Sequence, residues 1–548
     1  MRIVFQRGSS VARSQQVTLP ANVPAAPASR RAQWLIVAGW ALGVVAAFTC
    51  YLRLARTRAV DSDGASQALQ AWNMLHGNVL LHGWSLSDVS FYTTELPEYV
   101  LVEFVRGLNQ DVVHVAAAAT YTLLLLLAAL LVKGRATGRA GLARVLITVG
   151  IMIAPQLSGV KIFLSSPDHI GTSVPVLAAF LILDRAPQRR YVPVLVSAIL
   201  GWAAVADTLV LFIGVLPIAL VCLLRVGRGV WRERRWQQQW YYLALGVGSL
   251  AAGVAAELAL HVIRAAGGFV VQSPAIRLVH SVGAVPHTAT IAGQGLLLLA
   301  GADFLGLSRG SATAAVYLHL VGVILIGLGV FVAVRRFWRH LGFVDQILVT
   351  AVAVNLASYV FSTQAGSILT TREIAATLPI GAVLAGRMLA DRILLSRYVA
   401  AALLVVLVGY LGGLGSELTQ PPAPAQNHQL TSWLAAHHLS SGLSGYWEAN
   451  VVTLTSGDRV RVRQLTEVGH KLIPYNWNAD AAWYDARSQT ANFVVLVPGS
   501  SEYPGFTNTS AVLLTFGRPA HVYRVGAYRV LVWHDNLLRD LPRFGSAY

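Results

Sequence analysis

Apolar segments long enough to cross a lipid bilayer recur along most of this 548-residue chain. A transmembrane helix needs about 20 consecutive, mostly apolar residues. Only 12% of the residues are charged, whereas soluble domains carry about 25%. This composition excludes an ordinary soluble enzyme, a disordered chain and a fibrous protein, and it indicates a polytopic membrane protein.

The hydropathy pattern predicts eleven spanning helices. The long apolar stretch 191–224 is divided into two spans at Asp207, because it exceeds the length of one span. The eleven helices are expected to begin near Trp34, Val112, Val145, Ile170, Tyr191, Leu209, Tyr241, Ala314, Phe343, Glu373 and Tyr398.

Basic residues alternate between successive loops, and this alternation predicts the orientation. With the N-terminus in the cytoplasm, the inner segments are rich in arginine, whereas the outer loops hold acids as well as bases. Positively charged loops stay on the cytoplasmic side of a membrane. The net charge of +17 therefore reflects orientation in the plasma membrane and not nucleic-acid binding. An odd number of spans places the C-terminal tail outside the cytoplasm.

The tail differs in composition from the spans and begins with a Pro-rich linker. Within it, Gln429–Leu439 is patterned as an amphipathic helix, Ala491–Val497 as a buried strand, and two short β-like runs flank Gly526 as in a hairpin. We therefore expect an all-α membrane domain joined to a small α/β domain. The predicted domains are a disordered cytoplasmic lead (1–33), a transmembrane catalytic domain (34–416) and an extracytoplasmic α/β domain (417–548).

Two outer loops are long, at residues 53–111 and 264–313. In the first, Ala65–Leu75 has one apolar helical face, and a second short helix is expected between Pro97 and Gly107. Both helices are expected to lie on the membrane surface. The second loop contains an apolar stretch that favours an interfacial or re-entrant helix.

An acidic motif, Asp61-Ser62-Asp63-Gly64, directly follows the first predicted span. Two carboxylates at the membrane surface can hold a divalent cation, and one of them can act as a general base. The same spacing is typical of a helix N-cap, because either aspartate can accept a hydrogen bond from the first turn of the next helix. Spacing alone leaves both interpretations open.

A second acidic motif, Asp168-His169, lies in the short outer turn between the third and fourth predicted spans. The pair can converge with Asp61 on one site, or Asp168 can simply cap the fourth span. Asp61, Asp63, Asp168 and His169 together form a candidate set of metal ligands.

Several basic or polar side chains on the outer side are candidates for binding a phosphate. Arg372, next to Glu373, begins the tenth span, where a guanidinium suits a bidentate contact to a lipid phosphate. A surface pair of Arg372 with Glu373 is the alternative. Arg58 and Lys161 are further candidates for the donor phosphate, or for lipid headgroups reached by snorkelling. His287 in the second long loop is another polar candidate.

This layout resembles the glycosyltransferase C superfamily, and in particular its protein mannosyltransferase-like enzymes that use polyprenyl-phosphate sugars. The resemblance implies a hexosyl- or pentosyltransferase that moves a sugar from such a donor to a glycan, protein or lipid acceptor at the extracytoplasmic face, with inversion. It implies Asp61 as the general base, with Asp63 as the alternative, and Arg372 as the residue that binds the donor phosphate. It also implies Asp168 as the second acidic residue.

The sequence departs from the family pattern at both acidic motifs. Asp61 and Asp63 are not adjacent, and His169 stands where a second acid is usual. A divalent cation (Mg, Mn or Ca) as cofactor and the absence of any cofactor therefore both stay open.

Two other functions are compatible with a membrane chain of this kind. A lipid or solute transporter or flippase would show repeated halves and acids at the bilayer midplane, whereas the polar groups here gather near the outer surface. A non-catalytic scaffold, whose tail binds partners, predicts that Asp61→Asn leaves the phenotype unchanged.

Overall fold

The computed structural model describes residues 30–155, 158–186, 188–231, 239–273, 276–305, 312–425, 427–497 and 509–545. The chain divides into two units, Met1–Ala46 and Ala47–Tyr548. Helix α1 (Arg30–Ala55) begins in the first unit and ends in the second. Residues 1–29 of the predicted disordered lead lie outside the described residues, and Arg30 already begins α1.

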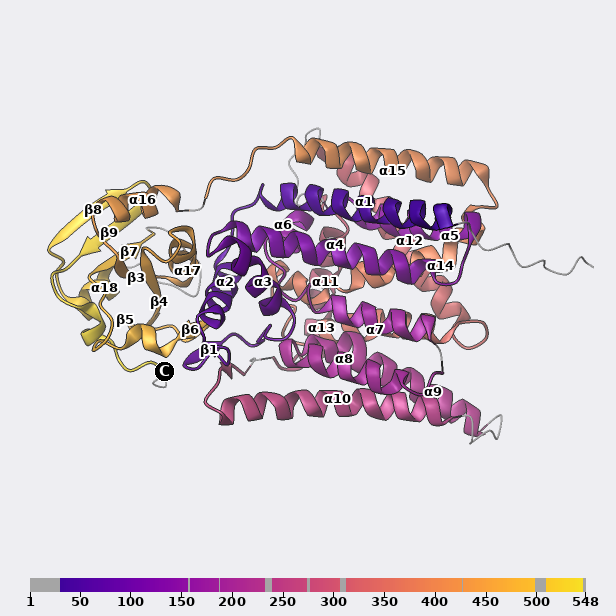
Figure 1. Ribbon diagram of the computed structural model, residues 1–548, viewed down its shortest axis with the longest axis horizontal. Coiled ribbons are helices and arrows are strands. Elements are labelled where there is room, and N and C mark those ends of the chain that lie inside the picture. Colours follow the sequence, from indigo (N-terminus) through magenta and orange to yellow (C-terminus); the bar gives the residue numbers. More distant parts are fainter. Residues whose placement is uncertain are drawn as a thin grey trace, which may run out of the picture. The chain divides into compact units, whose positions relative to one another are not determined.

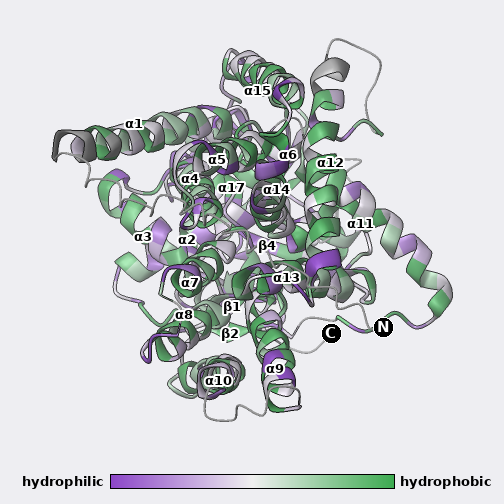
Figure 2. Ribbon diagram, turned by 90° about the vertical axis from the view of Figure 1, so that its right-hand side faces the viewer, coloured by the Kyte–Doolittle hydropathy of each residue, from purple (hydrophilic) through white to green (hydrophobic). Residues whose placement is uncertain are grey.

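A helix lies at each position for which the apolar pattern predicts a span (Figure 1). Figure 2 views most of these helices end-on and shows many hydrophobic residues in them. Besides α1 they are α4 (Asp111–Lys133), α5 (Gly138–Met152), α7 (Ser173–Arg185), α8 (Val192–Ala206), the π-helical turn η1 (Leu211–Val215) with α9 (Leu216–Trp231), α10 (Trp240–Ala265), α12 (Ala312–Arg336), α13 (Phe343–Val360), α14 (Thr377–Ile393) and α15 (Arg397–Leu418).

Among the described residues, eight helices are long and apolar enough to cross a membrane. The number becomes nine if the short helix η4 (Ile368–Ile374) and α14, which meet at a bend of 53°, form one span. The chain is thus a multi-pass membrane protein. The predicted number of eleven differs because α5, α7 and α8 have only 15, 13 and 15 residues. In addition, α11 (Val285–Leu299) in the second long loop qualifies as a span together with the short turn before it.

The broken course of the third predicted span has a local cause. Pro155 follows α5 and separates it from the short helix α6 (Ser158–Leu164). Proline has no backbone N–H and cannot continue the hydrogen-bond pattern of a helix. The chain therefore turns before the loop that carries Asp168.

Small residues allow α14 to pack closely against its neighbours. A Cβ atom added at Gly329 of α12 would lie 2.6 Å from the Cα of Ala385, and one added at Gly386 would lie 2.5 Å from the Oγ1 of Thr148. Close backbone approach of this kind is the main way in which helices associate in lipid. These contacts fix α14, and with it the η4 turn that precedes it.

The first outer loop contains two helices where the sequence predicts them, α2 (Ser62–Leu75) and α3 (Glu95–Arg106). In α3 the side chains of Leu101, Phe104 and Val105 are 70%, 79% and 80% exposed. On the other face of α3, Leu96 and Tyr99 are buried. An amphipathic helix with an exposed apolar face is suited to lie in a membrane interface.

The tail forms a six-stranded sheet with the strand order β5-β4-β3-β7-β9-β8. Its helix α16, strand β7 and antiparallel β8–β9 hairpin confirm the helix, strand and hairpin predicted from the sequence. The elements are α16 (His428–Ala436), β3 (Ser441–Ser444), α17 (Tyr446–Thr455), β4 (Arg461–Val468), β5 (Lys471–Pro474), η5 (Ala481–Tyr484), β7 (Phe493–Leu496), α18 (Thr509–Phe516), β8 (His521–Val525), β9 (Tyr528–Val532) and η6 (Leu537–Asp540).

A second, very small sheet joins three distant parts of the chain. Its central strand β1 (Trp84–Leu86) comes from the first outer loop. It pairs with β2 (Val270–Val271) from the second long loop and with β6 (Ala479–Asp480) from the tail. The tail is therefore hydrogen-bonded to the loop that carries the first acidic motif.

Candidate active site

Three aspartates from two separate segments form an acidic cluster. One carboxylate oxygen from each of Asp61, Asp63 and Asp168 lies within 4.8 Å of the other two. Asp61 is the N-cap of α2 and accepts a hydrogen bond from the Gly64 amide at 3.0 Å. Gly64 is needed here, because a Cβ atom would lie 2.8 Å from Val113 and 3.1 Å from the Cβ of Ser166. Asp61 is thus both the N-cap of α2 and a member of the acidic cluster, so both interpretations of this motif apply to it.

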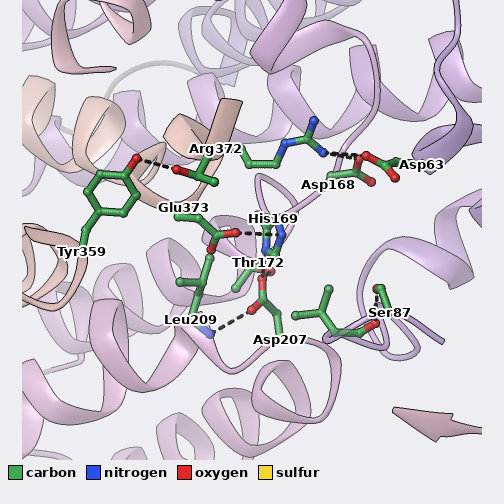
Figure 3. Close-up of polar contacts among 12 residues, drawn as sticks. Asp63, Ser87, Asp168, His169, Thr172, Asp207, Leu209, Tyr359, Arg372 and Glu373 are labelled. Carbon is green, nitrogen blue, oxygen red and sulfur yellow. Dashed lines mark hydrogen bonds and ion pairs between the residues drawn. The ribbon is translucent and has the colours of Figure 1, made fainter. Parts of the chain in front are cut away.

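Arg372 from η4 supplies the positive charge of this cluster (Figure 3). One of its guanidinium nitrogens lies 2.8 Å from Asp168 Oδ2 and 3.4 Å from Asp63 Oδ2. Asp168 is buried and also accepts hydrogen bonds from Ser166 at 2.7 Å and from the Gln67 side chain. With all three carboxylates ionised, one arginine leaves the cluster with an excess of negative charge.

This excess changes the acidity of the cluster. Burial raises the pKa of Asp61 to about 7, and the negative charges of Asp63 and Asp168 act in the same direction. Burial also raises the pKa of Asp168, although the nearby Arg372 guanidinium opposes the shift. A carboxyl group with a pKa near neutrality can gain and lose a proton under physiological conditions, as a general base must.

The tail contributes a side chain to the same cluster. The Tyr446 hydroxyl, at the start of α17, donates a hydrogen bond to Asp63 Oδ1 at 2.6 Å. Asn478 donates to that hydroxyl oxygen at 3.4 Å, and the Ser62 hydroxyl donates to the Tyr446 carbonyl oxygen. Asp63 is therefore held between a tail hydroxyl and Arg372.

His169 belongs to a different cluster from its neighbour Asp168. Its backbone has a positive φ of 59°, and its ring lies 2.8 Å from Asp207 Oδ2 and 3.4 Å from Glu373 Oε1 (Figure 3). Burial opposes protonation of the ring, but the charges of Glu373, Asp207 and Asp88 outweigh it and raise the pKa of His169 to about 10. His169 is therefore a cation held by carboxylates. Although the sequence groups it with the three aspartates as a candidate metal ligand, it lies outside their cluster.

A cavity of about 310 Å³ lies on the His169 side of the site. Its polar wall contains His169, Asp207, Asp88 and Glu373. Its apolar wall contains Leu209, Phe212, Ile276, Leu278 and Phe361. Because His169 and Glu373 directly follow Asp168 and Arg372 in the chain, the cavity is adjacent to the acidic cluster. Its size and its mixture of walls are typical of a small-molecule site.

The three other predicted basic or polar candidates lie on α6, on α11 and in the turn after α1. Lys161 is exposed on α6, and His287 is exposed in the first turn of α11. Within the part of the chain that the structure describes, neither side chain makes a hydrogen bond or ion pair with the acidic cluster. Arg58 lies in the turn after α1, where its carbonyl oxygen accepts a hydrogen bond from His114 at 3.1 Å.

Sequence reasoning gave no role in the site to Tyr446, Gln67 and Asp88. It used Asp207 to divide two spans and weighed it as an ionisable group at a span end, but it did not connect Asp207 with His169. Asp207 could have been found from its position, because an acid at the outer end of two apolar helices needs a partner. The motif Gly445-Tyr446-Trp447 is visible in the sequence, but nothing local connects it to Asp63.

No protein-family model and no curated protein matches this sequence. Among solved structures, ArnT from Cupriavidus metallidurans bound to undecaprenyl phosphate matches with a TM-score of 0.54 and 12% identity, covering 90% of this chain and 98% of that chain. The oligosaccharyltransferase from Archaeoglobus fulgidus, in complex with Zn and sulfate, matches with a TM-score of 0.48 and 13% identity, covering 82% of this chain and 67% of that chain. The likeness to ArnT shows that this chain has the glycosyltransferase C fold, as its sequence resemblance predicts.

Proposed function

We propose that this chain is a membrane glycosyltransferase that transfers a sugar from a polyprenyl-phosphate donor to an acceptor hydroxyl on the extracytoplasmic face. The observation that carries the proposal is the convergence of Asp63 and Asp168 on Arg372, with Asp61 alongside, although these residues are far apart in the chain. The ArnT structure of similar fold contains undecaprenyl phosphate, which supports a donor of that class.

Asp61 is the proposed general base. Glycosyl transfer to a hydroxyl requires a group that removes the hydroxyl proton as the new bond forms. The pKa of Asp61, raised to about 7, suits this task at neutral pH. Both oxygens of Asp63 already have partners, Tyr446 on one and Arg372 on the other. Asp63 is accordingly the positioning acid in this proposal, and attack opposite the phosphate inverts the anomeric carbon.

Arg372 is the proposed ligand of the donor phosphate. Negative charge grows on the phosphate oxygen as the bond to the sugar breaks, and a fixed guanidinium stabilises that charge. The Arg372 side chain is 32% exposed, so a phosphate can reach it beside the aspartates. The cavity lined by His169 and Glu373 would then hold the sugar, with its apolar wall toward the prenyl chain.

The three-aspartate cluster also fits a divalent cation. Three carboxylate oxygens within 4.8 Å are the kind of donor set that Mg, Mn or Ca prefers. Each of Asp61, Asp63 and Asp168 would offer one oxygen to the ion, so the second oxygen of Asp61 would be the one that acts as the base. Asp63 and Asp168 would share their charge between the ion and Arg372. A bound divalent cation would supply further stabilisation of the leaving phosphate.

A transfer assay tests the proposal. Purified protein is incubated with a panel of polyprenyl-phosphate sugars and an acceptor extract, and products are detected by mass spectrometry. Wild type is compared with Asp61→Asn, Asp168→Asn and Arg372→Ala. The matched control is Asp391→Asn, which removes a 66% exposed aspartate paired with Arg144. Activity in wild type and control but in none of the three variants supports the proposal, and transfer that survives all three changes refutes the site assignment.

A further inference from the structure

A second large cavity, of about 680 Å³, lies far from the candidate active site. The continuous helix η1–α9 spans 21 residues from Leu211 to Trp231, and at about 1.5 Å per residue it is roughly 30 Å long. Asp207, which pairs with His169 in the wall of the first cavity, lies four residues before Leu211. Arg225 and Arg228, which line the second cavity, lie in the last two turns of the helix. The two sites are therefore at opposite ends of one helix.

Three arginines, Arg225, Arg228 and Arg339, line this cavity, and the described residues of its wall include no acid. Arg225 donates to Gln346 at 2.7 Å and to the Tyr242 hydroxyl at 3.1 Å, and Arg228 donates to the Trp338 carbonyl oxygen at 2.6 Å. All of these partners are neutral. In the described part of the chain, none of the three arginines forms an ion pair with a carboxylate.

Arg387, which has a structural role, differs from the cavity arginines because it pairs with acids. It pairs with Asp345 at 2.6 Å and with Asp184, and its side chain is 9% exposed. The cavity arginines instead combine positive charge, neutral partners and an open space between them. This arrangement is what an anionic ligand requires.

The surroundings of the cavity favour a membrane lipid as that ligand. Trp240 and Trp338, both in its wall, are 45% and 58% exposed, and tryptophan gathers at the depth of lipid headgroups. Leu224 of the wall and the adjacent Leu223 are 40% and 67% exposed, so acyl chains can run along α9 from the cavity. Figure 2, which faces this end of the helices, shows hydrophilic turns on α9 next to hydrophobic ones.

We propose that the cavity between α9, α10 and the α12–α13 connection binds the headgroup of an anionic phospholipid, with Arg228 and Arg339 holding its phosphate and Arg225 positioned beneath by Gln346 and Tyr242. Basic pockets between transmembrane helices bind lipid phosphates in this way. The positive-inside rule assigns these loops to the cytoplasmic leaflet. The site does not depend on the proposed glycosyl transfer.

Native mass spectrometry of the detergent-purified protein tests this site with dioleoyl phosphatidylglycerol, dioleoyl phosphatidylcholine and soluble glycerol 1-phosphate as probes. The test variant is Arg228→Gln with Arg339→Gln. The matched control is Arg335→Gln with Arg336→Gln, which removes two exposed charges from the end of α12 that do not line the cavity. The single variant Arg339→Gln replaces the double one if gel filtration shows that the double variant is misfolded.

Phosphatidylglycerol should bind the wild type more tightly than phosphatidylcholine. The test variant should lose about fivefold in phosphatidylglycerol affinity per arginine, the effect of one basic residue near an anionic lipid, and the control should match wild type. Equal affinity for the two lipids, or an equal loss in the control, would overturn the proposal. Displacement of the lipid by glycerol 1-phosphate at equal concentration would overturn the lipid assignment in favour of a soluble phosphate.

Discussion

Two arginines of the same bent segment, Arg372 in η4 and Arg387 in α14, each lie between two aspartates from distant parts of the chain. Arg387 forms a separate contact with each partner and is 9% exposed. Arg372 uses one nitrogen for both partners and is 32% exposed. A third acid, Asp61, lies beside the Arg372 cluster. The same residue types therefore form buried ion pairs around Arg387 and a partly exposed, negatively charged cluster around Arg372.

The difference shows which features separate a structural ion pair from a candidate site. A buried pair with good geometry is costly to break, because the remaining partner is left uncompensated. A partly exposed cluster with an excess of negative charge can still bind a ligand. Perturbed acids in such a cluster are typical of functional sites.

Arg372→Ala should have the largest effect on activity. In the proposed function Arg372 stabilises the leaving phosphate, so its loss should lower kcat for glycosyl transfer by roughly 10²–10³-fold. The unfolding midpoint should change little, because Arg372 is partly exposed and the neighbouring acids can take up protons. Steady-state transfer kinetics and detergent unfolding on one preparation measure both quantities, and a large loss of stability with unchanged kcat contradicts the assignment.

Arg387→Ala should give the opposite result. Removal of this arginine leaves Asp184 and Asp345 without a partner and should cost about 3–5 kcal/mol of unfolding free energy. Transfer activity per folded molecule should stay near wild type, since the residue is far from the acidic cluster. A thermal unfolding curve combined with an assay of the monodisperse fraction tests this, and Arg392→Ala, in the same helix, is the control.

The pH dependence of glycosyl transfer tests the role proposed for Asp61. A base with a pKa of about 7 is active when deprotonated, so the transfer rate should rise about tenfold from pH 6 to pH 8. Asp61→Asn should remove this rise along with most of the activity. A wild-type profile that is flat across this range, with the chemical step limiting, would argue against Asp61 as the base.

Asp61 also makes the free energy of unfolding depend on pH. Its pKa is 3.8 in the unfolded reference and about 7 in the fold, so the folded state binds the proton more tightly between these values. The free energy of unfolding should therefore decrease as pH rises from 4 to 7 through this group. The decrease should be smaller in Asp61→Asn, which can be measured by unfolding at several pH values.

Tyr446→Phe should have the smallest effect. It removes the hydroxyl that donates to Asp63 at 2.6 Å, a contribution on the order of 1 kcal/mol, and should lower kcat a few-fold while the tail stays folded. Tyr528→Phe, which loses a hydroxyl contact to Asn427 within the tail, is the matched control. If both variants behave alike in the transfer assay, Tyr446 has no specific role at the site.

Much of the fold could be predicted because its signals are local. The apolar runs, the two helices of the first outer loop and the hairpin around Gly526 follow from periodicity and turn residues. The lengths of the helices in the membrane could not be predicted as well, since a break such as the one at Pro155 divides an apolar run without ending it. Strands of two or three residues, such as β1 and β6, have no period to detect.

The site was predictable only in part for a similar reason. Asp63, Asp168 and Arg372 share the outer ends of predicted spans, so their convergence follows from topology. His169 was grouped with Asp168 because the two residues are adjacent in the chain. In the structure the His169 backbone has a positive φ of 59°, and its ring contacts Asp207. Tyr446 is 383 residues from Asp63, and an aromatic residue at the start of a short helix is more often part of a core.

The pairing of β6 with β1 has a consequence for the biogenesis of the protein. The ribosome synthesises the chain from its N-terminus. Asp63 is therefore made 383 residues before Tyr446, whose hydroxyl donates a hydrogen bond to it. A chain that ends before the tail lacks both the Tyr446 hydroxyl and strand β6, which forms one edge of the small sheet. The tail must therefore be synthesised and folded before the contact between Tyr446 and Asp63 in the acidic cluster can form.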